Sequence, residues 1–535
     1  MNRQLNRLTL LCLFLLQAIT QSCMKEADAP QWDIEVLGPV VNATLGMDQL
    51  IADSLQAIGP DGKVRLVLDQ LIDNFASDSV YTIPDTGIRT IYTWDFFPFS
   101  IPPGTPFFTN NKNILLNVKG AQLTDAIIRK GEIRLTARNT LPTRVYFTYT
   151  IPEARKNGMP FTFSASVDSG SFTHPTLYST TLDFSGYDVN LTGATHDLVN
   201  TFAYNVLARS DSAGQAFSVN PGDTLLDITT DLLGINPRYV KGYIGQKTLQ
   251  STDTFEIGIG SLFQSGQLRL DSATLNLRLE NSVGADIQAY IQSLQSVNSR
   301  TGTTIDLIAT DVLRRNLNIN RASETGNSGD PVRPTVLSLS MDNSNSNLNA
   351  FLQNLPDKII TELNYSLNPL ANISGNNDFI FDDRLISTRV NLQIPLRLST
   401  SALTLMDTLE FSIKDFTDFS NVKNTLLTVV ADNGFPFEMK LQLYPMDASF
   451  SIMDSLLVPD RIAPAMTDVF LRVTDHVTTS IDIPIDENRK SRILQSPYLL
   501  VKASFTSSGS PDYLDLYSDY SLRFKLLFDG TYGIR

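Results

Sequence analysis

Few residues in this chain have the types and spacing that catalysis requires. The histidines His174, His196 and His476 stand alone, and none has a cysteine or carboxylate at metal-ligand spacing. The sequence contains no glycine-rich phosphate loop, no serine nucleophile elbow and no dinucleotide fingerprint. The stretches Asn376–Asp378 and Asp382–Asp383 lack the spacing of a calcium loop and are typical of turns. We therefore expect no catalytic residue, no metal site, no cofactor and no enzymatic activity.

Cysteine usage is more informative, because the chain has only two cysteines, Cys12 and Cys23. A basic start followed by an apolar run over Leu8–Ile19, too short to cross a bilayer, predicts a signal peptide over residues 1–22. Cleavage there removes Cys12 and leaves one cysteine with no disulfide partner. The simplest use of Cys23 is then lipidation, with residues 23–30 as a tether. The alternative is an ordinary signal peptide that is cleaved nearby.

The residues Ile19-Thr20-Gln21-Ser22-Cys23 resemble a relaxed lipobox, although Thr20 stands where leucine is typical. In a lipobox the cysteine is diacylated and becomes the first residue of the mature protein. The segment Met24–Asp28 is similar to the export signal of surface lipoproteins from Bacteroidetes-type bacteria. These resemblances imply acyl chains such as palmitate on Cys23, and an outer-membrane lipoprotein at the cell surface with the membrane as its first partner.

The charge of the chain argues against polyanionic partners. The net charge is −14 and the isoelectric point is near 4.8. Binding to nucleic acid or to an anionic lipid surface needs a basic patch, and no Lys/Arg cluster follows the leader. No later apolar stretch is long enough to span a membrane. We expect no nucleic-acid partner.

A pattern of alternating strand, asparagine, short turn and second alternating strand occurs three times, around Asn139, Asn281 and Asn433. We interpret each copy as a β-hairpin, and the long spacing indicates one small β-domain per copy. Two further pairs of segments match: 201–210 with 361–370, and 251–259 with 405–413. The expected fold is mainly β, with tandem antiparallel β-sandwich-like modules and one or two short helices.

The repeated core is similar to the water-stress (WHy) and late-embryogenesis-abundant β-sandwich domains, in which an asparagine follows a strand. It differs from them because Asn139, Asn281 and Asn433 precede Thr, Ser and Gly instead of Pro. The resemblance implies a fold and no function. A tubular lipid-binding fold is the alternative.

We expect three β units in the mature chain. The first covers residues 31–200 and includes the first repeat, the second covers 201–330, and the third covers 335–535. The Gly/Ser/Asn-rich stretch Ala322–Pro334 has the composition of a linker or mobile loop. An apolar stripe predicts an amphipathic helix over 347–360, kinked or ended at Pro356.

The stretch 92–108 is rich in aromatic residues and prolines. It could be an exposed platform for a partner or a sugar. We favour a strand in which Tyr92, Trp94 and Phe96 share one inward face.

The function we expect is that of a lipid-anchored cell-envelope protein acting as a non-catalytic binding or structural scaffold, with an envelope protein or glycan as a possible partner. The alternative is a carrier of a lipid or another apolar ligand. A carrier would need strands that are apolar on both faces; Leu426–Val430 fits that requirement, whereas Thr274–Leu279 alternates.

Overall fold

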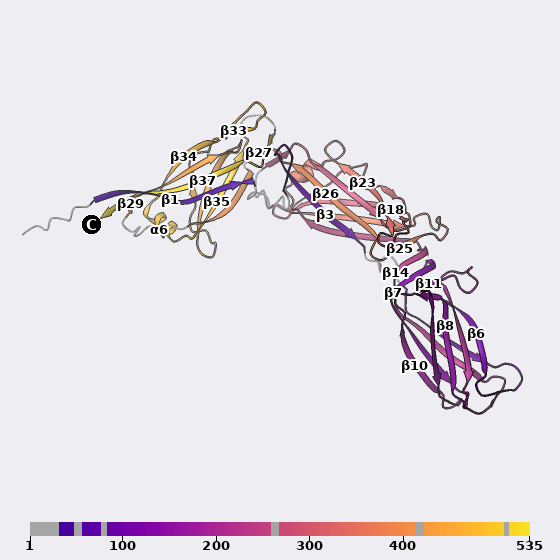
Figure 1. Cartoon of the computed structure of the whole chain (residues 1–535). Coiled ribbons are helices and arrows are strands. Elements are labelled where there is room, and N and C mark those ends of the chain that lie inside the picture. Colours follow the sequence, from indigo (N-terminus) through magenta and orange to yellow (C-terminus); the bar gives the residue numbers. More distant parts are fainter. Residues whose placement is uncertain are drawn as a thin grey trace, which may run out of the picture.

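The computed structural model describes residues 32–47, 56–75, 83–257, 267–401, 403–411, 422–507 and 513–534. The predicted fold class is confirmed, because antiparallel strands dominate these residues. Figure 1 shows three β bodies in a row, which we call the proximal, middle and distal modules. The indigo strand β1 lies beside the yellow strand β37, so the first and last described segments share the proximal module.

The proximal module has two four-stranded sheets, in the orders β1-β37-β29-β34 and β28-β35-β30-β31. The strands of the first sheet are β1 Trp32–Gly46, β37 Ser521–Ile534, β29 Val422–Asn433 and β34 Val477–Pro484. Those of the second are β28 Leu403–Glu410, β35 Tyr498–Thr506, β30 Glu438–Met446 and β31 Leu456–Leu457.

The middle module repeats this arrangement, with β3-β26-β17-β23 facing β15-β24-β18-β20. The first sheet contains β3 Val64–Asn74, β26 Ile386–Pro395, β17 Thr274–Asn281 and β23 Thr335–Met341. The second contains β15 Lys247–Glu256, β24 Lys358–Leu367, β18 Ile287–Asn298 and β20 Asn316–Ile319. The short strands β2 Gln56–Ile58 and β19 Thr303–Asp306 extend the two sheets.

The distal module repeats it again, with β4-β14-β7-β10 and β6-β12-β8-β9. The first group contains β4 Thr86–Thr93, β14 Thr224–Tyr243, β7 Gln122–Asn139 and β10 Thr176–Asp183. The second contains β6 Pro106–Leu115, β12 Thr201–Ser210, β8 Val145–Lys156 and β9 Met159–Val167. Strand β11 (Asp188–Asn190) pairs with both β7 and β8, so here the two sheets join along one side into a nearly closed sheet.

The modules are nested within one another along the chain. Strands β1, β3 and β4, one from each module, come first, and the distal, middle and proximal modules are then completed in that order. The middle module is thus inserted between β1 and β28, and the distal module between β3 and β15. Strand pairing therefore does not follow the expected units 31–200, 201–330 and 335–535. Strand β14, for example, pairs with β7 across the expected boundary at residue 200.

Each of the three asparagines ends one strand and begins a crossing to the opposite sheet. Strands β7, β17 and β29 do not pair with the strands that follow them, so the predicted hairpins are wrong and the connections are β-arches. The hydrogen bonds of Asn281 show why this residue recurs. Its Nδ2 donates to the carbonyls of Ala285 (2.9 Å) and Asn320 (3.0 Å), and its Oδ1 accepts from the Val283 N–H (2.9 Å). The side chain thereby supplies hydrogen-bond partners to backbone groups that have none in a β-ladder.

The other two arches use the same bonds. Asn139 donates to Thr143 and Asp168 and accepts from Leu141. Asn433 donates to Phe437 and Ala463 and accepts from Phe435. In all three copies one of the two carbonyl groups that the asparagine binds is four residues after it, and the N–H group that it binds is two residues after it. This agreement supports three copies of one module.

Two local expectations need correction. The helix predicted over 347–360 is shorter: α5 covers Leu348–Gln353, and Leu355 just before Pro356 already has φ of +50°. The predicted linker 322–334 is instead tied down, because Ala322 and Val332 are buried and β21 (Ser323–Glu324) pairs with β22 (Val332–Arg333). Helix α6 (Glu487–Leu494), capped by Asp486, was not predicted.

Candidate functional site

The row of modules has two different ends. At one end β1 starts with Trp32 opposite Ile534 of β37, and we call this end the base. Cys23 and the expected tether lie outside the described residues, and they precede the base in sequence. Strand β14 pairs with the middle module near Lys241, so its opposite end faces away from that module. The arch of Asn139 and the end of β4 at Thr93 lie at this opposite end. We call this end the tip.

Each module has one end that contains its asparagine arch, which we call the arch end. In the proximal and middle modules the arch end is covered by the next module. At the middle module, β25 (Phe379–Phe381) lies beside the Asn281 arch and pairs with β14 of the distal module. The rings of Phe381 and the distal residue Tyr239 are 4.7 Å apart. At the proximal module, Lys63, directly before β3, pairs with Asp515 at 3.0 Å and lies over the ring of Tyr517. Aromatic side chains therefore take part in both internal junctions.

The corresponding end of the distal module is free of any other described module. Residues 94–105 cross this end between β4 and β6, which are the edge strands of the two sheets. In the proximal and middle modules the same connection, from β1 to β28 and from β3 to β15, contains the entire next module. The loop therefore stands where the other two copies carry a folded neighbour.

This loop displays phenylalanine side chains to solvent. Phe96, Phe97 and Phe99 are 65%, 72% and 44% exposed. Their rings surround Trp94, with centroids 5.2, 6.5 and 5.9 Å from the indole. We call Trp94, Phe96, Phe97 and Phe99 the aromatic tip.

Hydrogen bonds hold the aromatic tip in this arrangement. The Trp94 Nε1–H donates to the Phe97 carbonyl at 2.7 Å. The Trp94 backbone N–H donates to the Asp223 carbonyl at 2.8 Å, and the Gly222 N–H donates to the Trp94 carbonyl at 2.7 Å. Strand β5 (Phe99–Ile101) pairs with β13 (Phe217–Val219). The exposed rings are thus fixed to the module by backbone contacts.

The predicted inward face of 92–108 is correct only at its start. Tyr92 is buried, with its ring 4.3 Å from that of Phe108, and burial beside Tyr204 raises the pKa of its hydroxyl. Strand β4 ends at Thr93, so the alternation that would have turned Phe96 inward stops there. The sequence contained this signal in the prolines that follow Phe97 and Ile101, which disfavour a continuous strand.

Acidic residues flank the aromatic tip. Asp95, Asp211 and Asp223 each accept hydrogen bonds within local turns, from Thr93, Ala213 and Asn220. Among the described residues none of these three carboxylates is in an ion pair. Residues 94–105 include no other charged side chain. Two arginines lie beside Asp211: Arg144 pairs with Asp168, and Arg209 lies over the Tyr146 ring. The tip therefore combines an apolar centre with a rim that is negative overall.

The residues considered for metal or catalytic chemistry are not brought together. His174, His196 and His476 each contact a nearby side chain: Thr173, Thr192 and Asp432, respectively. Within the described ranges there is no group of three or more His, Cys, Asp or Glu residues that could hold a metal ion.

The stretches 376–378 and 382–383 have structural contacts where the middle module meets the distal module. The buried Asp378 accepts from the Asn368 amide at 2.8 Å. Asp382 pairs with Arg129 of the distal module. These contacts fit the interpretation of the stretches as structural turns.

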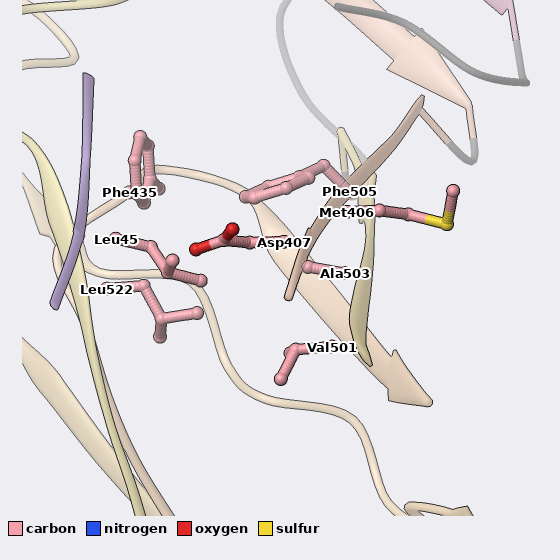
Figure 2. A pocket seen from close by; sticks show the side chains of 8 residues that line it. All are labelled: Leu45, Met406, Asp407, Phe435, Val501, Ala503, Phe505 and Leu522. Carbon is pink, nitrogen blue, oxygen red and sulfur yellow. The ribbon is translucent and has the colours of Figure 1, made fainter. Parts of the chain in front are cut away.

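Two spaces between facing sheets, one in the proximal module and one in the distal module, are small. Figure 2 shows the one in the proximal module, where Leu45 and Leu522 from one sheet face Val501 and Ala503 from the other. The volume open to water is about 10 Å³ there and about 20 Å³ in a similar space of the distal module. One water needs roughly 10–15 Å³ on this measure. Neither space is large enough for a lipid chain.

The described residues define a class: an elongated protein of three nested β-sandwich modules, with an exposed aromatic surface at one end. In the part that the structure describes, no helix has the length and apolar character needed to cross a membrane. No protein-family model matches the chain, and no curated protein matches it.

Among solved structures, the chain is similar to one described as a secreted protein from Parabacteroides distasonis. The identity is 14%, with 53% of this chain and 82% of that chain covered and a TM-score of 0.27. A chain in the cryo-EM structure of broad bean stain virus has 9% identity, 61% and 91% coverage and a TM-score of 0.16. Similarities this low carry no functional argument.

Proposed function

We propose that this chain is a lipid-anchored scaffold of the cell envelope that holds its aromatic tip away from the membrane for binding. The observation that supports this most directly is the position of the two ends. The mature N-terminus leads into β1 at the base, whereas the aromatic tip lies two modules away at the opposite end. A binding surface next to the anchor would need no such spacer.

The proposed anchor is the diacylated Cys23. Each buried methylene of an acyl chain contributes about 0.8 kcal/mol, so two or more chains are enough for stable attachment. The lipobox-like sequence and the similarity of Met24–Asp28 to surface export signals support an outer-membrane position facing outward. The repeated Asn-ended strand supports a relationship of the modules to WHy-type β-sandwiches.

The proposed role is non-catalytic. The histidines and the junction acids are engaged in local or structural contacts. The aromatic tip offers apolar area and no nucleophile or general base. Apolar surface exposed on a rigid loop is typical of binding sites.

Metabolic labelling with an alkyne fatty acid tests the anchor. Cys12→Ala is a matched control, because Cys12 and Cys23 are the two cysteines of the chain. We expect the natural protein and Cys12→Ala to be labelled and to remain with membranes, and Cys23→Ala to lose both properties. Equal labelling of Cys23→Ala would refute the proposed anchor.

A further inference from the structure

We propose that the aromatic tip is the docking site for a protein partner that presents an apolar recess ringed by basic side chains. The proposal rests on the proposed function for the direction in which the tip faces. The partner is a folded protein of a different kind, and not a glycan, a lipid surface or a second copy of this chain.

The first argument comes from the internal junctions. The arch end of a module is covered by a folded β-sandwich in two of the three copies, and the connection between the two edge strands leads into that neighbour. Both covered ends use aromatic side chains, namely Phe381 with Tyr239 and Tyr517 with Lys63. The third arch end has the same architecture and its aromatic side chains face solvent. The tip therefore carries aromatic side chains like those that contact a folded module at the other two arch ends, but no described module covers it.

The second argument is the size of the apolar area. A phenylalanine can bury roughly 150–250 Å². With exposed fractions of 65%, 72% and 44% for Phe96, Phe97 and Phe99, the tip offers roughly 270–450 Å². An ordinary interface buries about 800 Å² on each partner, with an apolar centre and a polar rim. The aromatic tip has the size of such a centre.

The chemistry of the side chains separates the possible occupants. Sugars are held by polar groups as well as by rings, but the polar groups at the tip already have partners. The Trp94 Nε1–H donates to Phe97, and the three carboxylates accept from Thr93, Ala213 and Asn220. Asp95, Asp211 and Asp223 repel anionic lipid headgroups, and the same rim repels an identical rim on a second copy. A basic rim around an apolar recess complements both features.

Site-specific photocrosslinking in the cells that make the protein tests this proposal. The photoreactive amino acid p-benzoylphenylalanine replaces Phe97, which keeps an aromatic ring in place. Phe470 of the proximal module, 83% exposed, is the matched control position. We expect position 97, and not position 470, to give a crosslink to one polypeptide that mass spectrometry identifies as a different protein.

The purified polypeptide is then titrated against the purified chain in a calorimeter. We expect Phe96→Ser/Phe97→Ser to weaken binding at least tenfold, Phe470→Ser to leave it unchanged, and added salt to weaken it. No crosslink above that at position 470, a crosslink to a second copy or to lipid, or binding only to added oligosaccharide would overturn the proposal. The fatty-acid labelling of Cys23 is independent of these outcomes, so failure here is distinguishable from failure of the proposed anchor.

Discussion

Replacement of Asn281 by alanine tests the physical role of the repeated asparagine. The side chain is fully buried and makes three hydrogen bonds to backbone groups. Truncation leaves two carbonyls and one N–H without a partner. Each such group costs about 1 kcal/mol or more. We expect the free energy of unfolding of the middle module to fall by about 3 kcal/mol, a large part of the roughly 5–15 kcal/mol typical of a domain.

Asn318→Ala is the control in the same module. Asn318 is exposed, and its Oδ1 accepts one hydrogen bond from Gln288 at 2.9 Å. Its loss is expected to cost less than about 0.5 kcal/mol. Hydrogen exchange read by mass spectrometry on peptides from β17 and β18 measures both variants. The loss should be confined to the middle module, and its melting temperature should fall by roughly 6–12 °C. A loss below about 1 kcal/mol for Asn281→Ala would show that the arch does not depend on these bonds.

Three further predictions follow from the described contacts. The fragment 84–245 holds all strands of the distal module and should unfold cooperatively by circular dichroism, whereas 201–330 should be unfolded because β12 and β14 lose β6, β7 and β8. Arg89, hydrogen-bonded at 2.9 and 2.6 Å, keeps the pKa of Asp227 below its usual range, so the stabilisation is present above about pH 4 and is lost as pH falls through the lowered pKa. Asp227→Asn should therefore cost about 1.5 kcal/mol at pH 7 in urea unfolding, with a difference that shrinks in acid. Gly284→Ala places a Cβ 2.2 Å from the Phe379 ring and should loosen the middle–distal junction, measured as faster hydrogen exchange in β25.

The repeats could be recognised in the sequence because each arch has backbone groups that need a hydrogen-bond partner, and asparagine supplies it in all three copies. The matched pairs 201–210 with 361–370 and 251–259 with 405–413 are equivalent strands, β12 with β24 and β15 with β28. Their assignment to modules could not be read. Similarity does not say whether a strand belongs to the copy before it or to the copy after it. Strand β12 belongs to the distal module, which β14 then completes.

The arches and the tip were missed for physical reasons as well. An alternating strand has one dry face whether it turns back in a hairpin or crosses to the facing sheet, so the residues around Asn139 fit both. At the tip, the interpretation of Phe96 as inward assumed that β4 continues past Thr93. Where a strand ends depends on its partner, here the start of β14 at Thr224, which is far away in sequence.

The pairing of β1 with β37 fixes the order in which the chain can fold. β1 is synthesised before the other described strands, but its partner β37 is the last of them, so β1 must wait until β37 has been made. The distal module has all of its strands in one continuous stretch and can close earliest, followed by the middle module and then the proximal one. Long-range pairing of this kind is slow, and a waiting edge strand is open to wrong partners. A chain that lacks β37 would therefore have a folded distal module with its aromatic tip, but an incompletely folded proximal module.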